Sequence, residues 1–162
     1  MRRPEPINKV VEEANALALV GTAQLAIRSR LDLDPSAPVA PIDRVQIQQV
    51  LVNLIRNAIE AMAGCATREL LVRTAAADSL VRVSVRDSGP GIAADVASRL
   101  FQPFVSTKAS GMGIGLSICR SFVELHQGRL WFTRNAERGA TFHVGLPLMK
   151  TPSPTATATS AP

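Results

Sequence analysis

The chain of 162 residues has only two cysteines, Cys65 and Cys119, and it has no run of eighteen apolar residues. The cysteines fit no metal-ligand spacing and are too few for a disulfide framework, so we expect reduced thiols in a cytoplasmic protein. The N-terminus carries two arginines without the apolar stretch of a signal peptide behind them. The sequence therefore predicts neither a membrane span nor a secreted protein.

Lysine is also scarce, because three lysines and fifteen arginines stand against thirteen acidic residues, for a formal charge of +5. This excess suggests an anionic partner. The basic residues are scattered, with Arg73, Arg82 and Arg86 on predicted strands and Arg120 and Arg129 around a predicted helix. No aromatic residues are interleaved with them, so we expect a bound nucleotide and a solvated surface, and no nucleic acid.

Two common nucleotide-binding motifs are missing as well. Neither the Walker A pattern G-x-x-x-x-G-K-[ST] nor the Rossmann pattern G-x-G-x-x-G occurs. A nucleotide would therefore need a different architecture. The 46% of hydrophobic residues are enough to bury the core of one domain.

Apolar periodicity predicts three helices, the first over residues 9–28. The clearest follows Asp43, which with Gln46 resembles a capping box, and Gly64 stands just past its end. A third helix is predicted from about Leu116 to His126. The second helix has a continuous apolar stripe of Ile47, Val50, Leu51, Leu54, Ile55, Ala58, Ile59 and Met62.

Alternating patterns predict strands between these helices. Prolines at positions 35, 38 and 41 mark a connection, and residues 76–79 join two antiparallel strands whose valines point inward. The predicted strands are residues 28–35, 69–75, 79–87, 129–133 and 140–146. The fold class is thus α+β, a two-layer sandwich with a mostly antiparallel sheet covered by helices on one face. Residues 4–149 form the predicted domain, and residues 150–162 a disordered tail or linker.

The segment VNLIRNAIEA places Asn53 and Asn57 on the flank of the second helix. At 100° per residue, Gln46 and Glu60 fall within about 60° of these asparagines. Carboxamide and carboxylate oxygens suit a hard cation such as magnesium. An ordinary polar edge beside an apolar stripe is the alternative, although asparagine is a poor choice for a solvated helical edge.

Two glycine-containing segments follow. In RDSGPGI, Asp87 ends a strand and could accept a hydrogen bond from the exocyclic amine of adenine, while the glycines let the backbone approach a ligand. In SGMGIGLSICRS, Gly111, Gly113 and Gly115 lead into the third helix, whose N-terminus could bind phosphate. A plain turn and a flexible hinge are the respective alternatives.

Together these motifs resemble the ATP-binding domain of sensor histidine kinases, a member of the GHKL superfamily with the Bergerat fold. NLIRNAIEA resembles its N box, DSGPGI and GMGIGLSI its two glycine boxes, FQPFVSTK its F box and GATF its last turn. All five occur in the family's order over residues 50–146. The F box residues and the RNAIEAM segment after Asn53 are most similar to the nitrogen-regulation and FixL-like branch of those kinases.

The resemblance implies ATP and Mg²⁺ as ligands. It implies that Asn57 ligates magnesium with help from Asn53, that Asp87 binds the adenine amino group, and that Thr141 assists through a water. Phe101 and Phe104 would anchor a lid. The remaining implied ATP-binding residues are Gly89, Gly91, Ile92, Lys108, Gly111, Met112, Gly113, Ile114, Gly115 and Leu116.

Asn53 also indicates the kind of reaction. In ATP-hydrolysing relatives a glutamate at this position is the general base for water, and a carboxamide cannot take that proton. The resemblance therefore implies transfer of the γ-phosphate to a histidine. Neither His126 nor His143 has the surroundings of a phosphoacceptor, so we expect the acceptor on a dimerisation domain absent from this chain, with a response regulator as the next partner. The full-length kinase is expected to be a homodimer, and this chain a monomer that does not autophosphorylate alone.

Two other functions share the predicted site. One is a GHKL-type ATPase switch or chaperone fragment, which Asn53 disfavours. The other is an anti-sigma-type serine kinase, whose phosphorylated product would be stable in acid, unlike phosphohistidine.

Overall fold

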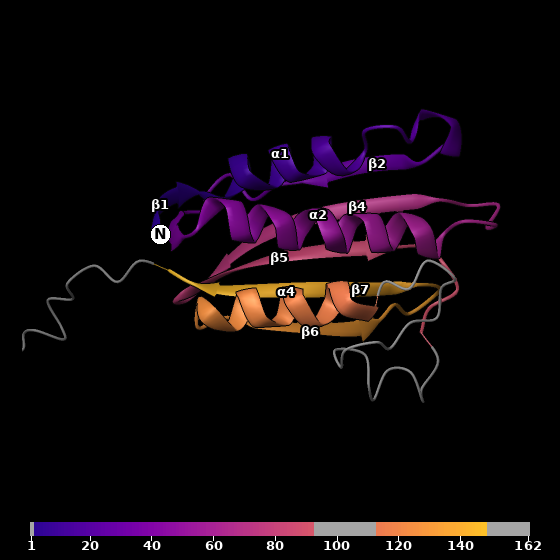
Figure 1. Cartoon of the computed structure of the whole chain (residues 1–162). Coiled ribbons are helices and arrows are strands. Elements are labelled where there is room, and N and C mark those ends of the chain that lie inside the picture. Colours follow the sequence, from indigo (N-terminus) through magenta and orange to yellow (C-terminus); the bar gives the residue numbers. More distant parts are fainter. Residues whose placement is uncertain (1, 93–112, 149–162) are drawn as a thin grey trace, which may run out of the picture.

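The computed structural model describes residues 2–92 and 113–148. Its main feature is a five-stranded sheet in the order β2-β4-β5-β7-β6 (Figure 1). Strands β2 and β4 are parallel, and the other neighbours are antiparallel. The strands are β2 (Arg28–Asp32), β4 (Glu69–Ala77), β5 (Leu80–Asp87), β6 (Arg129–Arg134) and β7 (Ala140–Pro147).

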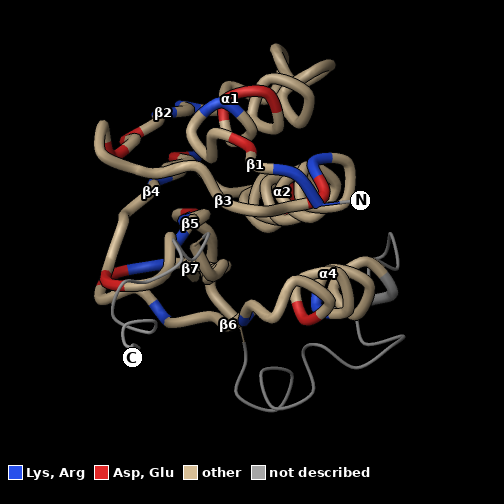
Figure 2. The backbone as a smooth tube through the Cα atoms, turned by 90° about the vertical axis from the view of Figure 1, so that its left-hand side faces the viewer, with Lys and Arg blue, Asp and Glu red and all other residues tan. Residues whose placement is uncertain are grey.

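Three helices lie on one side of this sheet, as the view along the layers shows (Figure 2). They are α1 (Ile7–Ala18), α2 (Arg44–Ala61) and α4 (Gly113–Leu125). The buried core lies between the layers, where the α2 stripe meets the inward valines Val81, Val83 and Val85 of β5. The predicted α+β sandwich is confirmed. The predicted tail, residues 150–162, lies outside the described residues, and the domain boundaries at 4 and 149 stay predictions.

A second, two-stranded sheet was not predicted. It pairs β1 (Arg3–Pro6) with β3 (Val39–Ile42) in antiparallel register, and Pro4 lies opposite Pro41. Proline is compatible with such edge strands, where its missing N–H disrupts no second ladder. The prediction that prolines only mark a connection here is therefore wrong at Pro41.

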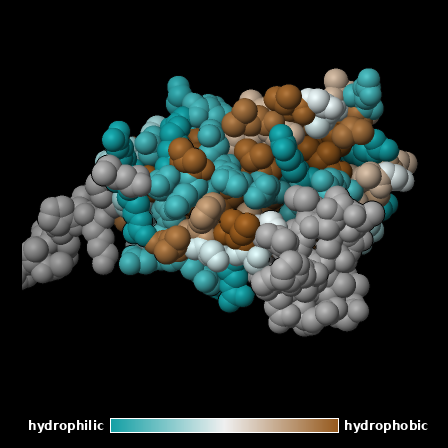
Figure 3. Space-filling view, viewed as in Figure 1, coloured by the Kyte–Doolittle hydropathy of each residue, from teal (hydrophilic) through white to brown (hydrophobic). Residues whose placement is uncertain are grey.

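The first predicted helix, residues 9–28, extends ten residues too far at its C-terminal end. Helix α1 ends at Ala18, a 3₁₀ turn covers Ala23–Leu25, and β2 then begins. Gly21 has a φ of +79°, a left-handed conformation that an α-helix cannot continue through. Val20 and Leu25, which follow the helix, are exposed, and Val20 retains 70% of its accessible surface. Hydrophobic side chains gather over this region in Figure 3.

Helix α2 confirms the prediction over its whole length. The Asp43 carboxylate accepts a hydrogen bond from the backbone N–H of Gln46 at 3.1 Å, which is the cap that the sequence predicts. The backbone N–H of Asp43 itself donates to Nε2 of His126 at 2.9 Å. A histidine following α4 thus completes the cap in place of the Gln46 side chain of a capping box.

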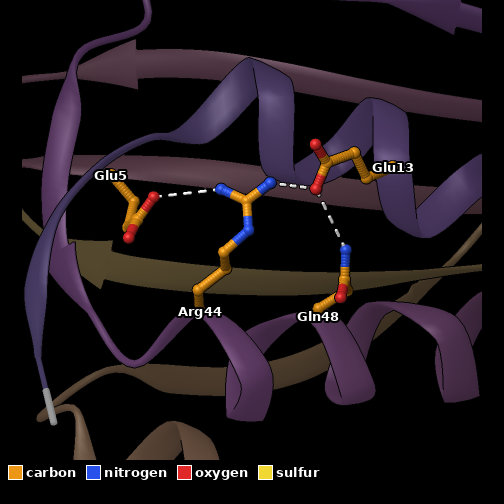
Figure 4. A network of polar contacts seen from close by, with 4 residues as sticks. All are labelled: Glu5, Glu13, Arg44 and Gln48. Atoms are coloured by element: carbon orange, nitrogen blue, oxygen red, sulfur yellow. Dashed lines mark hydrogen bonds and ion pairs between the residues drawn. The ribbon is translucent and has the colours of Figure 1, made fainter.

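An ionic network holds the N-terminal segment against α2 (Figure 4). Arg44 donates to Glu5 of β1 at 3.0 Å and also to Glu13 of α1. Gln48 adds a hydrogen bond to the same Glu13 carboxylate at 3.3 Å. One arginine in the first turn of α2 therefore joins β1 and α1.

We call the side of the sheet opposite the helices the open face. Several basic residues gather on it, so the prediction that the basic residues are scattered is wrong. Arg73, Arg82 and Arg86 all point to the face opposite the helices, and Arg129 of β6 lies there with Trp131. Strand register gathers residues that are up to 56 positions apart, from 73 to 129. The basic residues therefore cluster in space.

His143 lies in the middle of the open face and gives a pH-dependent prediction. Its ring nitrogens contact Ser84 Oγ and Thr133 Oγ1, each at 2.9 Å. Burial, and then the charge of Arg82, lowers the pKa of His143 below its usual 6.5. The unfolded chain therefore binds this proton more readily, and the free energy of unfolding falls as the pH drops through about 6.5.

Urea unfolding at pH 7.5 and 5.5 tests this expectation. The stability lost between the two pH values should be larger for the native chain than for His143→Gln, which keeps hydrogen-bonding groups but does not titrate. An equal loss in both proteins would show that His143 carries no linkage. Carboxylates titrate alike in both chains and cancel in the comparison.

Candidate functional site

The two asparagines of α2 face different surroundings. Asn57 is buried, with 6% of its surface exposed. Asn53, one turn earlier, is half-buried, and its Nδ2 donates to Sγ of Cys119 on α4 at 3.7 Å. Burial raises the pKa of the Cys119 thiol to about 11, so the sulfur is neutral near pH 7. This contact directs the amide nitrogen of Asn53 toward α4.

Asp87 ends β5 as a buried carboxylate with 4% of its surface exposed. Its Oδ1 accepts a hydrogen bond from the backbone N–H of Gly89 at 2.8 Å. Its main-chain carbonyl accepts one from Nδ2 of Asn135 at 2.9 Å. Both the side chain and the backbone of Asp87 are therefore held in place.

Close backbone approach brings the predicted motifs together. A Cβ on Gly89 would lie 2.8 Å from the carbonyl oxygen of Ala61, so the turn after β5 contacts the last turn of α2. Asn57 lies one helical turn before Ala61 on the same helix. Gly91 has a φ of +90°, which favours glycine, and Ile92 packs partly buried against the core.

The β6–β7 turn contributes Asn135, which the sequence did not predict, and Gly139, which lies in the GATF segment but had no predicted role. Asn135 in the β6–β7 turn donates to the carbonyl oxygens of Asp87 and Arg138, at 2.9 and 2.7 Å, and its Oδ1 accepts from Thr141 Oγ1 at 2.6 Å. Gly139 follows with a φ of +87°, and a Cβ there would lie 2.0 Å from the carbonyl oxygen of Asp87. An asparagine and a glycine in one short turn were the available signal.

The structure corrects the expectation for Thr141. Register pairs Thr141 with Arg86, so its side chain points to the open face, and its hydroxyl donates to Asn135. The Asp87 side chain follows Val85 on the helix side of the sheet. Thr141 therefore holds Asn135, and its hydroxyl faces away from the Asp87 carboxylate.

Helix α4 begins earlier than predicted, at Gly113 in place of Leu116. Gly113, Ile114 and Gly115 thus form its first turn, and Leu116 is buried with 8% exposure. The N–H groups of a first helical turn have no partner within the helix and can bind an anion. Other predicted residues lie outside the described residues: Phe101, Phe104, Lys108, Gly111 and Met112.

Both histidines are engaged in structural hydrogen bonds. Nδ1 of His126 donates to the carbonyl of Phe122 at 2.8 Å, and its Nε2 accepts from Asp43, which defines a neutral tautomer. His143 bonds to two hydroxyls and stacks on Trp131 with ring centroids 5.0 Å apart. The expectation that neither is a phosphoacceptor stays a prediction.

Residues 2–92 and 113–148 lack two features that a metal centre or a membrane protein can have. They contain no cluster of three or more His, Cys, Asp or Glu side chains arranged to hold a metal ion. None of the helices among them has the length and apolar character needed to cross a membrane.

Comparison with known proteins agrees with this geometry. Residues 42–150 match the family described as histidine kinase-, DNA gyrase B- and HSP90-like ATPase. The sensor protein FixL of Bradyrhizobium diazoefficiens is 52% identical over 90% of this chain, which spans 29% of FixL. The chain thus covers less than a third of that relative.

Solved structures give the same result for the fold. The catalytic domain of histidine kinase ThkA superposes with a TM-score of 0.82 at 33% identity, covering 91% of this chain and 96% of that domain. ThkA is also solved in complex with the response regulator TrrA. Full-length ShkA in complex with AMPPNP gives a TM-score of 0.81 at 26% identity, covering 94% of this chain and 32% of ShkA. The chain therefore belongs to the histidine kinase-, DNA gyrase B- and HSP90-like ATPase family, as a catalytic ATP-binding domain of the sensor histidine kinase type.

Proposed function

We propose that this chain binds Mg²⁺–ATP between α2, the turn after Asp87 and the start of α4, and that the γ-phosphate passes to a histidine on a dimerisation domain. The main support is a pair of buried polar side chains, Asn57 and Asp87, on two elements that contact each other through Gly89 and Ala61. A carboxylate suits the exocyclic amine of adenine, and a carboxamide oxygen suits a hard cation held with phosphate oxygens, so Mg²⁺–ATP matches both side chains.

Asp87 is the residue we assign to adenine. One of its carboxylate oxygens already accepts the Gly89 N–H at 2.8 Å, which orients the group. A carboxylate only accepts hydrogen bonds, so it suits the exocyclic amine of adenine. Gly89, Gly91 and Ile92 would form the walls beside the base. Thr141 has no place in this pocket, because its hydroxyl faces the other side of the sheet.

Asn57 and Asn53 are the residues we assign to magnesium. Their amide oxygens are hard donors, which fits a cation that prefers oxygen ligands and retains waters and phosphate oxygens around it. When bound, magnesium would neutralise charge on the phosphates. The Cys119 contact would leave the Asn53 oxygen directed away from α4.

The first turn of α4 is the proposed phosphate site. Gly113, Ile114 and Gly115 would present backbone N–H groups at the positive end of the helix dipole. Gly111, Met112 and Lys108 would extend this contact, with Phe101 and Phe104 anchoring the lid, as the family resemblance implies. AMPPNP bound to ShkA supports a nucleotide site in this fold.

Asn53 favours transfer over hydrolysis. Its carboxamide cannot accept a proton from water, so no general base stands at the position where hydrolysing relatives have glutamate. Phosphoryl transfer needs mainly positioning and charge neutralisation. The bond from the γ-phosphorus to the ADP oxygen breaks as a bond to one imidazole nitrogen forms. ADP leaves, and the proton on the other ring nitrogen passes to solvent.

The acceptor and the next partner lie outside this chain. We propose a dimerisation domain of the same homodimeric kinase as the donor of the histidine, and a cytoplasmic response regulator as the receiver of the phosphate. The complex of ThkA with TrrA supports the second partner. Both histidines here are held in structural hydrogen bonds, which supports an acceptor elsewhere.

Mixing this chain with the FixL dimerisation domain and γ-labelled ATP tests the proposal. We expect label on the histidine of that domain, and none on this chain incubated alone. Asn57→Ala should reduce the labelling rate about tenfold through loss of the metal contact. The label should be lost in acid and retained in base, as for phosphohistidine.

Two outcomes would contradict the proposal. Fast release of free phosphate without labelled histidine would indicate an ATPase, and acid-stable label would indicate a serine acceptor. Lys9→Ala, a change on the exposed side of α1, is the control and should leave the labelling rate unchanged. If the FixL domain is not recognised, label should still appear with a dimerisation domain from another relative.

A further inference from the structure

The side chains of the open face fall into three lateral rows set by the strand register. The middle row contains a salt bridge between Asp32 and Arg73, with Nε and Oδ2 3.2 Å apart. It continues through the Ser84–His143 hydrogen bond and ends at Trp131, which stacks on His143. The polar groups of this row are therefore engaged with one another.

The two flanking rows carry basic residues instead. Arg30 and Arg86 share one row, with Leu71 between them. Arg82 and Arg129 share the other, with Gly145 between them. Within residues 2–92 and 113–148, none of these four exposed arginines forms a salt bridge.

Acidic residues on this face do not balance these charges. Asp32 is paired with Arg73, and Glu69 with Arg28 at 3.8 Å. Glu137 lies at the rim, in the β6–β7 turn. The four arginines of the flanking rows, which we call the corner arginines, therefore concentrate positive charge on a face that no helix within residues 2–92 and 113–148 covers (Figure 2).

The geometry of the corner arginines defines what could bind them. Two strand spacings separate the two residues of each row, so their Cα atoms are about 10 Å apart. Arg82 and Arg86 are four residues apart on β5, or about 13 Å. A hollow of about 170 Å³ lies between them, and a groove of about 720 Å³ extends from Arg86 past Arg28 and Arg30.

We propose that the open face docks a carboxylate-rich surface of another protein domain. Arginine and tryptophan are enriched at the centres of protein interfaces, and arginine pairs bidentately with carboxylates. Trp131 is not a free stacking platform for a nucleobase, because the Arg129 guanidinium lies 4.9 Å from its ring centroid and His143 also stacks on it. The face therefore suits a protein more than a nucleic acid.

The fluorescence of Trp131, the one tryptophan of the chain, reports directly on the open face. Poly-L-glutamate of about twenty residues, the carboxylate probe, should protect Trp131 from acrylamide quenching. The protection should weaken when the salt concentration rises from 0.05 to 0.5 M, because a shorter Debye length screens exposed charges. The measurement needs no nucleotide, so its outcome is independent of the kinase assignment.

Charge reversal shows whether the corner arginines are responsible. Arg82→Glu/Arg86→Glu should weaken probe binding about tenfold or more. The matched control is the double variant Lys9→Glu/Arg120→Glu. It reverses the same number of charges at exposed residues of α1 and α4, on the helix side of the sheet. Thermal melts should confirm that both double variants fold.

Three outcomes would overturn the proposal. The first is no protection of Trp131 by the probe, and the second is an equal loss of binding in both double variants. The third is tighter binding of an oligothymidylate of equal charge, which would assign the face to nucleic acid. Protection lost only in Arg82→Glu/Arg86→Glu supports protein docking at the open face.

Discussion

Replacing Asp87 by asparagine should weaken ATP binding roughly 5- to 150-fold, which corresponds to about 1 to 3 kcal/mol for an unsatisfied buried group. The amide oxygen can keep the bond from the Gly89 N–H, which is 2.8 Å long in the native chain. The amide nitrogen then replaces the other carboxylate oxygen. Its N–H groups would face the exocyclic amine of adenine, which is also a hydrogen-bond donor. Titration calorimetry with ATP measures the loss directly.

The control for this variant is Asp78→Asn in the turn between β4 and β5. It makes the same change of charge at an exposed residue at the opposite end of β5. Its φ of +50° suits asparagine as well as aspartate, so the fold should tolerate it. Unchanged ATP affinity in a folded Asp87→Asn protein would refute the adenine assignment.

Replacing Gly139 by alanine should cost more than about 4 kcal/mol of stability, which is exceptional for one methyl group. The added Cβ would lie 2.0 Å from the carbonyl oxygen of Asp87 and 2.9 Å from its Oδ1. These are atoms of a buried, hydrogen-bonded residue, so the β6–β7 turn or β5 must move. Thermal unfolding should show a fall in Tm of well over 10 °C or no folded state.

Gly64→Ala separates the clash from the cost of the backbone conformation. Gly64 has a φ of +86°, against +87° at Gly139, and a Cβ there would meet no atom within 4 Å. The left-handed conformation alone costs alanine about 1 to 2 kcal/mol. A similar fall in Tm for both variants would mean that the contact between Gly139 and Asp87 has little effect on stability.

The sequence predicts local features of this fold well. Helix α2 has both a cap at Asp43 and an unbroken apolar stripe, and each of these signals is contained within one segment. Strands β1 and β3 have four residues each and include prolines, and they pair across 39 positions, as Arg3 with Ile42. No local pattern can predict a pairing of two such distant, irregular segments.

Sequence motifs predict some residues of the candidate site but not all of their orientations and contacts. Asn57 and Asp87 were predicted because each stands in a recognisable segment, but their roles stay predictions. The orientation of Thr141 was predictable from the alternation of Phe142, Val144 and Leu146 on the buried side, and the family resemblance outweighed that signal. Asn135 donates to the carbonyl oxygen of Asp87, 48 positions away, so the residues of its turn predict a bend but not this partner.

The clustering of the corner arginines also could not be predicted from the sequence, because it depends on strands that are distant in the chain. Each lies on an exposed position of its own strand, and only the register of neighbouring strands brings Arg30 beside Arg86 or Arg82 beside Arg129. Composition gives the excess of charge, but not its location. Sheet pairing, which forms late and over long distances, determines where that charge lies.

The hydrogen bond from Asp43 to His126 bears on how precisely the first turn of α4 is positioned. It fixes the C-terminal end of α4 to the start of α2, while the opposite end of α4 carries Gly113. With thirteen residues, α4 is about 20 Å long, so its Gly113 end lies far from the end that this hydrogen bond holds. A tilt of only about 3° would displace the N–H groups at Gly113 by roughly 1 Å, about the tolerance of a hydrogen bond.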